Sequence, residues 1–350
     1  MTADRIKEQY QKSIRRKIAF ILFSIFLLIL ITGISASLGS AGITIWEVYA
    51  TILYKFFPGH FHTSWLAKTC VWDLRLPRIS LGILTGFNFG IAGAVMQGIL
   101  RNPLASPYTL GISAGAGFGA TLAIITGLGF IGGEYSIIGN AFIFALLCSF
   151  IILALASRRG VTPETLILIG IAILYIFSAA TIILQYFGSE EAIAAAVFWT
   201  VGGLDRASWD QVFISAIILA CSIPLLMIKS WDLNVMATGD EVAKSLGVNI
   251  KGVRIFTLSI ITFMVASTVC FTGTIGFIGL VAPHIARLVI GEDNRFLLPA
   301  SGIVGAVLLV GADVLARNVI PPVVLPVGAI TAFMGGPLLL YLVKRRRGYW

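Results

Sequence analysis

The sequence predicts an all-α protein that crosses a membrane about ten times, and three observations lead to this prediction. Of the 350 residues, 58% are hydrophobic and only 12% are charged, whereas soluble domains are roughly 45–50% apolar and about 25% charged. Apolar stretches of about 20 residues, the length of a membrane-spanning helix, follow one another from residue 18 almost to the end. The net charge is +9, but the bases lie in short clusters between these stretches, which argues against a nucleic-acid partner and for membrane lipid.

The ten expected helices form one membrane domain over residues 18–343, between a basic segment at 1–17 and a basic tail at 344–350. The positive-inside rule places both basic ends in the cytoplasm and requires an even number of crossings. With ten crossings, 19 of the 25 Lys and Arg residues lie on the cytoplasmic side. Cleavage of the first stretch as a signal peptide is disfavoured because its apolar run is too long. The expected spans are 18–38, 77–100, 109–130, 136–157, 164–187, 209–229, 253–273, 274–291, 297–317 and 325–343.

Small residues recur at every fourth position in the second and third expected helices. They are Gly82, Gly86 and Gly90 in the second, and Gly111 and Gly115 in the third. Such ridges let helix backbones approach closely in lipid. We interpret them as packing positions, and the lining of a pathway is the alternative.

A loop of about 23 residues, 230–252, is the longest expected on the cytoplasmic side between membrane helices. Thr238 and Glu241 have the spacing of a capping box, and Gly247 supplies a helix stop, so the loop should contain a short helix over 239–246. This helix is either a capped connector or a docking element for a cytoplasmic protein.

The eighth and ninth expected helices each carry an unusual feature. Pro283 lies inside the eighth, near Gly276 and Gly279, which predicts a bent or broken helix and adds two glycines to the packing-or-pathway set. In the ninth, Asp313 precedes Arg317 by four residues, so both lie on one helix face near the outer end. We favour a structural ion pair over a proton relay.

No enzyme constellation is evident. The three histidines do not supply a metal cluster or a nucleophile with its base, so no metal site is expected. No glycine directly precedes a lysine, so the phosphate-cradling loop of an ATPase is absent. Uphill transport by this chain would therefore draw its energy from an ion gradient or from another subunit.

Seven stretches together resemble the permease subunits of ABC importers for iron-siderophore complexes, haem and vitamin B12, the FecCD or BtuC-like family. The resemblance covers the chain from about residue 70 onward, in the family's order. The matching stretches are LRLPR (74–78), GAVMQGILRNPLASPYTLG (93–111), WTVGGL (199–204), LNVMATGDEVAKSLGV (233–248), GTIGFIGLVAPHIARL (273–288), LLPASGIVGAVLLVGADVLAR (297–317) and LPVGAITAFMGGP (325–337).

The resemblance implies the BtuC-like permease fold of type II ABC importers, in the plasma membrane of a bacterium or archaeon. It implies a second permease subunit, identical or related, around a central path, and two cytoplasmic ATPase subunits that use ATP and Mg. It also implies an extracytoplasmic substrate-binding lipoprotein or periplasmic protein. This chain itself is expected to bind no cofactor and to be a non-catalytic transport subunit.

The family's ATPase-coupling helices correspond to one segment of the expected 230–252 loop. Its residues are Thr238, Gly239, Asp240, Glu241, Val242, Ala243, Lys244, Ser245, Leu246 and Gly247. The family's cytoplasmic gate corresponds to the turn at Thr162, Pro163 and Glu164. The vitamin B12 permease has small hydroxyl residues where this chain has Pro163 and Glu164.

Arg75, Arg78 and Arg317 match family arginines that face outward and pair with acidic residues of the binding protein. The charge-based topology places all three outside as well. The resemblance also implies import of a ferric siderophore, because this is the family's commonest cargo, with haem or cobalamin as alternatives. An ion-coupled secondary transporter is a weaker alternative, because no coupling residue is expected at mid-membrane.

Overall fold

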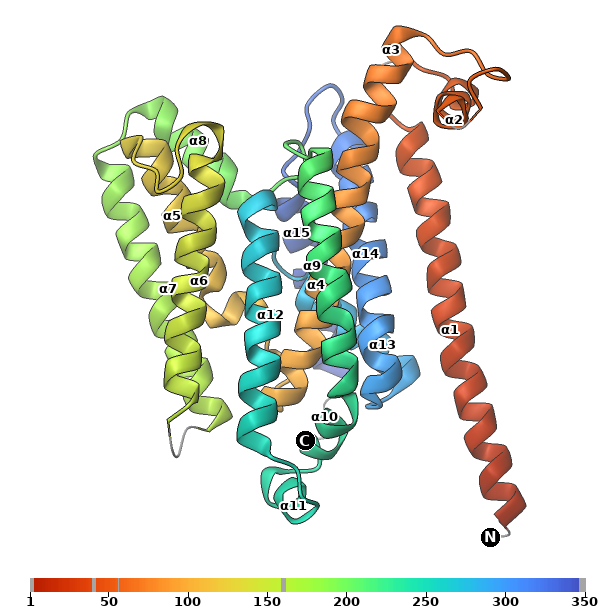
Figure 1. Ribbon diagram of the computed structural model, residues 1–350, viewed down its shortest axis with the longest axis vertical. Helices are drawn as coiled ribbons and strands as arrows, with labels where there is room; N and C mark the ends of the chain where they lie inside the picture. The colour runs from red at the N-terminus through yellow and green to blue at the C-terminus, as the bar shows by residue number, and fades with distance from the viewer. Residues whose placement is uncertain (1–2, 40–41, 56, 159–161, 346–350) are drawn as a thin grey trace.

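The computed structural model describes residues 3–39, 42–55, 57–158 and 162–345 as a bundle of helices, with no strand among them (Figure 1). Seven helices are long and apolar enough to cross a membrane. They are α1 (Ala3–Ser37), α4 (Leu76–Leu100), α6 (Ser136–Ala156), α7 (Pro163–Tyr186), α9 (Trp209–Ile228), α12 (Ile250–Thr272) and α14 (Asn294–Asn318).

Two of the ten expected spans are shorter apolar helices, α5 (Ile112–Thr126) and α13 (Ile278–Ile290). A third, α15 (Val327–Arg345), has a short apolar part over Val327–Leu340. At 1.5 Å per residue, the 13 residues of α13 extend about 20 Å, less than the roughly 30 Å hydrocarbon layer. The start of the span expected over 274–291 is therefore corrected to Ile278, whereas the prediction of a broken helix near Gly276 and Gly279 is confirmed. Residues 273–277 are not helical, and the break lies before Pro283, which stays inside α13.

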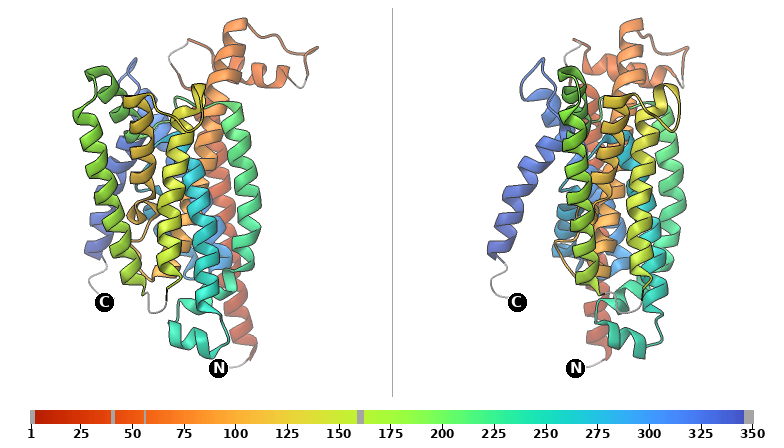
Figure 2. Two further views of the ribbon diagram at one scale, coloured as in Figure 1. Left: turned by 60° about the vertical axis from the view of Figure 1, so that its left-hand side comes forward. Right: turned by 90° about the vertical axis from the view of Figure 1, so that its left-hand side faces the viewer.

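The basic segment at the start is also helical. α1 runs without interruption from Ala3 to Ser37, because Lys, Arg, Glu and Gln are good helix formers. α1 stands at the side of the bundle, and its first residue lies at the same end as the last residues of α15 (Figure 2). This shared end also carries α11 (Asp240–Ser245) and is called the α11 end below; the opposite end is the α2 end.

Several elements between the expected spans were missed. α2 (Ile45–Tyr54) lies across the top of α1, and α8 (Glu190–Val201) follows α7 (Figure 1). The short helix α3 (Trp65–Lys68) and the π-helix η1 (Thr69–Arg75) extend α4 upward as one continuous 36-residue helix. Short helices η2 (Pro107–Leu110) and η3 (Gly133–Tyr135) precede α5 and α6, and α10 (Ser230–Met236) precedes α11.

α4 is the central helix, and it packs closely against α14, α13 and α12. Its glycines make this possible. An added methyl group at Gly86 would overlap the backbone of Gly305 in α14, and one at Gly90 would overlap Ser301. The same holds for Gly93 against Gly279 in α13. Close backbone contact through small residues thus fixes the centre of the bundle.

Candidate functional site

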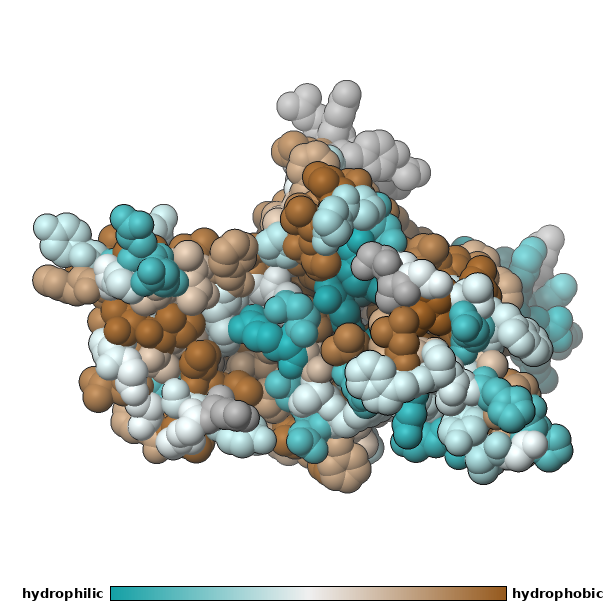
Figure 3. All heavy atoms as spheres, turned by 90° about the horizontal axis from the view of Figure 1, so that it is seen from above, coloured by the Kyte–Doolittle hydropathy of each residue, from teal (hydrophilic) through white to brown (hydrophobic). Residues whose placement is uncertain are grey.

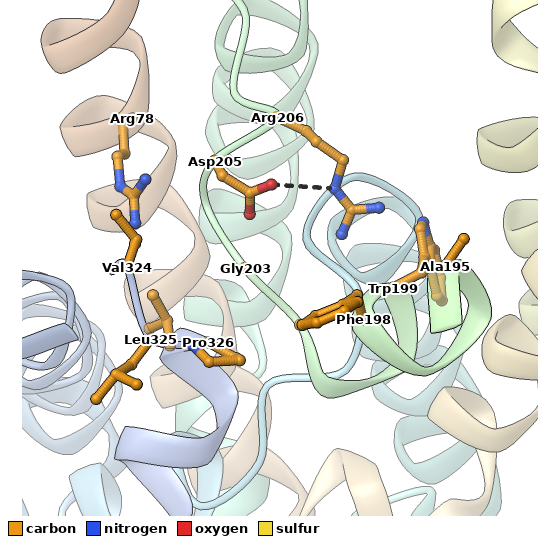
Figure 4. Close-up of a pocket in the computed structure, with 12 residues that line it drawn as sticks. Arg78, Ala195, Phe198, Trp199, Gly203, Asp205, Arg206, Val324, Leu325 and Pro326 are labelled. Atoms are coloured by element: carbon orange, nitrogen blue, oxygen red, sulfur yellow. Dashed lines mark ion pairs between the residues drawn. The ribbon is translucent and has the colours of Figure 1, made fainter. Parts of the chain in front are cut away.

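A cavity of about 390 Å³ opens at the α2 end, where α4, α8 and the segment before α15 converge (Figure 4). Arg78 enters it from α4, Trp199 from α8, and Pro326 from the segment that leads into α15. Asp205 and Arg206 lie in the loop between α8 and α9. Seen from this end, polar residues gather between apolar ones (Figure 3).

Arg206 is the cation that remains accessible in this cavity. Its side chain is 38% exposed, and its Nε lies 4.0 Å from the Asp205 carboxylate. The guanidinium lies 5.7 Å from the centre of the Trp199 ring, within the range of a cation–π contact. Burial lowers the pKa of Arg206 and Asp205 raises it, but an arginine stays protonated at neutral pH. The cavity therefore presents an accessible ion pair, Arg206 with Asp205, beside the Trp199 ring.

The three arginines expected to be exposed at the outer surface are instead engaged within the protein. Arg75 is only 5% exposed, and its Nη1 donates to the Ala36 carbonyl oxygen at 2.7 Å. Arg317 donates to the carbonyl oxygens of Ser35 and Leu38. The expectation of exposed side chains is corrected, because the last carbonyls of α1 have no helical partner and take these donors.

Asp313 joins the other two arginines of this set. One carboxylate oxygen accepts from Arg78 Nε at 2.8 Å, and the other accepts from Arg317 Nε at 3.0 Å. The expected pair between Asp313 and Arg317 is confirmed at i, i+4 spacing. The partner from α4, 235 residues away in sequence, was missed because nothing in the sequence brings the two together. We call Arg75, Arg78, Asp313 and Arg317 the outer arginine network.

A second cavity, of about 460 Å³, lies between α15 and the helix breaks at η2 and at residues 273–277. Among the residues that the structure describes, no charged side chain lines it. Gly276 borders this cavity, and an added side chain there would meet open space. Gly279, by contrast, lies against Pro107 and the Phe89 carbonyl oxygen. The two glycines next to the break thus have different surroundings.

The remaining glycines of the expected set are packed against neighbouring helices. Gly82 faces Leu204. Gly111 has a φ of +75° and lies against α7 near Gly170, and Gly115 lies against Cys148 of α6. The left-handed backbone at Gly111 suits glycine and lets α5 begin beside α7.

The segment that resembles coupling helices forms a projection at the α11 end (Figure 1). The helix is shorter than expected, and Thr238 does not cap it: the Thr238 hydroxyl donates to the Val235 carbonyl oxygen. Ala243 is its one buried residue among those described, whereas Val242 and Leu246 are 47% and 66% exposed. Glu241, Lys244, Ser245 and Gly247 are exposed as well. An exposed apolar surface on a projecting helix is typical of a protein contact.

The residues that resemble a gate form the start of α7, also at the α11 end. The Thr162 hydroxyl caps the helix by accepting from the Thr165 backbone N–H at 3.3 Å. Pro163 is the first helical residue, where its missing N–H costs nothing. Glu164 lies in the first turn and is exposed. Val161, which begins this turn, lies outside the described residues.

A second set of ion pairs, centred on Asp293, joins helices at the α11 end. Asp293 caps α14 and accepts hydrogen bonds from Lys17 of α1, Asn234 of α10 and Arg295. Burial alone raises the pKa of Asp293, but the hydrogen bonds outweigh it and hold the pKa well below its usual range. Asp293 is therefore ionised at neutral pH and links three helices.

The model of the FecCD transport family matches residues 27–345. The chain belongs to the FecCD transport family. It is 42% identical over 349 residues to an ABC transporter permease protein of Methanocaldococcus jannaschii, covering 97% of this chain and 98% of that one. It is 36% identical to the hemin transport permease HmuU of Yersinia pestis, covering 82% and 88%. Its fold matches a metal-chelate type ABC transporter solved in an inward-facing conformation, with a TM-score of 0.81, 28% identity and coverage of 93% and 98%.

Other relatives of this FecCD protein are named as import permeases for iron(3+)-citrate and vitamin B12. At this level its function is that of a multi-pass ABC importer permease, a transport subunit. The arrangement suits transport: a cavity with charged residues at the α2 end, a second cavity with an uncharged lining among the described residues, and a projecting helix at the α11 end. The cavity at the α2 end was missed in the sequence, because its residues come from three separate segments of the chain.

Proposed function

We propose that this FecCD protein is the membrane-spanning permease subunit of an ATP-driven importer for ferric siderophores. The uncharged cavity between α15 and the two helix breaks carries the importer part of the proposal, and the choice of an iron chelate rests on relatives named for iron(3+)-citrate import. A corridor that must release its cargo should bind it weakly, and a lining without charged groups meets this need. The outer end would receive the substrate from a binding protein, and the α11 end would face the cytoplasm together with both termini.

The energy would come from two ATPase subunits that bind ATP and Mg. Val242 and Leu246 of α11 offer an exposed apolar contact for such a subunit. Closure of the ATPase pair around ATP would then favour one state of the membrane helices over the other, so that the path opens to one side at a time.

The second permease subunit, identical or related, would complete the path on the side of α15. This helix projects from the bundle (Figure 2), and its Phe333 is 82% exposed. A binding lipoprotein or periplasmic protein would dock at the α2 end. The outer arginine network would support this docking face from within, and the accessible Arg206 would meet acidic groups there.

A haem or cobalamin permease is the second candidate. Relatives named for hemin and vitamin B12 favour it, and the described cavities carry no group that would discriminate among these cargoes.

The proposal is tested by reconstituting the chain in liposomes with its genomically adjacent ATPase and binding protein. ATP hydrolysis and uptake are measured with ferric siderophores, haem and cobalamin in turn. We expect one loaded binding protein to stimulate both activities. Uptake that follows an imposed proton or sodium gradient without ATP would instead support a secondary transporter.

A variant tests whether the uncharged cavity is the path. Gly276→Leu places a side chain into open space in this cavity, so we expect uptake to fall at least about tenfold while the complex still assembles. Gly311→Leu on α14 also meets nothing within 4 Å but does not line the cavity, and it should transport normally. Equal uptake by both variants would contradict a path through this cavity.

A further inference from the structure

The short helix α11 is held to the bundle mainly by charge. Ala243 is the buried residue of this six-residue helix. The larger apolar side chains, those of Val242 and of Leu246 directly after the helix, are exposed. Apolar burial is therefore a small part of what keeps α11 in place.

Asp240, the first residue of α11, joins α11 to two membrane helices. One oxygen of its carboxylate accepts from Arg101 Nη2 at 2.6 Å, and the other accepts from Arg254 Nη2 at 3.2 Å. Arg101 follows the last residue of α4, and Arg254 lies in the first turns of α12. The Arg254 side chain is only 9% exposed, whereas those of Arg101 and Asp240 are 36% exposed. One carboxylate thus links three elements at the α11 end.

The backbone has a positive φ at Arg101 and at Gly239, the residue before Asp240. Arg101 has a φ of +44° and, apart from Phe277, is the only non-glycine residue with positive φ among those described. This left-handed conformation at the end of a helix is normally left to glycine, so a long charged side chain here comes at an energetic cost. Gly239, with a φ of +120°, precedes Asp240 and lies over the Arg101 guanidinium.

The same two arginines influence the start of α7 through space. The Thr162 side chain has the largest effect on the Glu164 carboxylate, in the first turn of α7, and the charges of Arg101 and Arg254 act on it more weakly. Asp240 is hydrogen-bonded to both arginines, whereas Glu164 interacts with them only at longer range. Any shift of α11 that loosens Asp240 from these arginines changes the field at Glu164.

We propose that Asp240 is a positioning residue that passes displacement of α11 to α4, α12 and the start of α7 through Arg101 and Arg254. This inference rests on the proposed function, in which an ATPase subunit moves α11 and the start of α7 gates the path. The link is rigid enough to transmit a displacement because it consists of charge-assisted hydrogen bonds in place of flexible apolar contacts.

The test uses the reconstituted complex of permease, ATPase and binding protein, and it compares Asp240→Asn with Asp232→Asn. Asp232 is a matched control, because it pairs at 3.0 Å with Lys229 at similar exposure, but within one turn of α10 rather than between elements. Three quantities are measured: retention of the ATPase by the tagged permease, ATP hydrolysis with and without loaded binding protein, and substrate taken up per ATP.

We expect Asp240→Asn to retain the ATPase, to lose most of the stimulation by loaded binding protein, and to take up at least about fivefold less substrate per ATP. Arg101→Gln should lower both quantities in the same direction, and the double variant should be no worse than Asp240→Asn, because Asp240→Asn already weakens both contacts of this carboxylate. Asp232→Asn should match the wild type. If Asp240→Asn does not accumulate in the membrane, Arg101→Gln decides the question.

Wild-type uptake per ATP in the Asp240→Asn or Arg101→Gln complex would overturn the inference, as would an equal loss in Asp232→Asn. Failure of the proposed function has a different signature: the wild-type permease would then retain no ATPase. Leu246→Asp further distinguishes contact with the ATPase from transmission of its movement. This variant should weaken retention of the ATPase, whereas Asp240→Asn should leave retention unchanged.

Discussion

Asp313 is the acceptor on which the outer arginine network depends. It is 1% exposed and binds Arg78 and Arg317 at once. Asp313→Ala would leave two guanidinium groups buried without their acceptor, and breaking such a pair costs about 3–5 kcal/mol. We expect a clear drop in the thermal unfolding midpoint of the purified protein.

Asp205→Ala is the control for this change, because its carboxylate is 63% exposed and lies 4.0 Å from Arg206. Its effect should stay within about 0.5 kcal/mol. Similar midpoints for the two variants would show that the outer arginine network adds nothing to stability.

Asp293 predicts a dependence of stability on pH. The pKa of Asp293 is lower in the folded protein than in the unfolded chain, so its ionised form stabilises the fold at neutral pH. This stabilisation is lost as the pH falls below the ordinary aspartate value of 3.8 toward the folded value. Asp293→Asn keeps a helix-capping side chain but removes the charge, so it should cost about 1 kcal/mol or more at pH 7. The difference in free energy of unfolding between Asp293→Asn and the wild type, measured from pH 7 down to pH 3, should become smaller. A difference that stays constant would contradict the stabilising role of the ionised Asp293.

Two glycines of the central helix α4 show how an element depends on close packing. An added methyl group at Gly93 would overlap the Gly279 carbonyl of α13, whereas one at Gly98 meets nothing within 4 Å. Gly93→Ala should therefore destabilise the protein by about 1–3 kcal/mol. Gly98→Ala should be neutral or stabilise it by up to about 1 kcal/mol through helix propensity. Folded yield and thermal midpoint, measured on both variants, check the contrast.

The ten apolar helices could be predicted, because length and hydropathy mark each of them. A broken helix was predicted from Pro283, a visible helix breaker, but the end of the break was not, since the positive φ of Phe277 has no sequence signal. α8 was missed because, although its residues are largely apolar, its 12 residues are too few to cross a membrane. Its one signal is Ser189, which caps the helix before Glu190 and Glu191.

The functional residues likewise divide into those with a local sequence signal and those without one. The pair of Asp313 and Arg317 follows from helical spacing, but topology assigns a residue only to one side of the membrane. It could not show that Arg75 is buried against α1. Likewise, Asp240 could be assigned to a short helix, while its partner Arg101 is 139 residues away in sequence. Contacts between distant segments are set by packing and leave no local pattern.

At the scale of the whole molecule, α15 predicts where the second permease subunit binds. Phe333 is 82% exposed, and α15 closes one side of the uncharged cavity. In a background without native cysteines, Phe333→Cys should form a cross-link to the second permease chain, whether identical or related. Phe26→Cys on α1, where the native side chain is 62% exposed, should not. The reverse pattern would place the subunit interface at α1.

The contacts of α1 bear on how the protein is made. Near its end, Ser35 accepts from Arg317, which is 282 residues further along the chain, and Lys17 pairs with Asp293, 276 residues further. During synthesis the first helix therefore enters the bilayer long before these partners exist. Until α14 is inserted, the carbonyl oxygens at the end of α1 must accept hydrogen bonds from water and lipid headgroups. The helix that is synthesised first is thus among the last to be fixed in place.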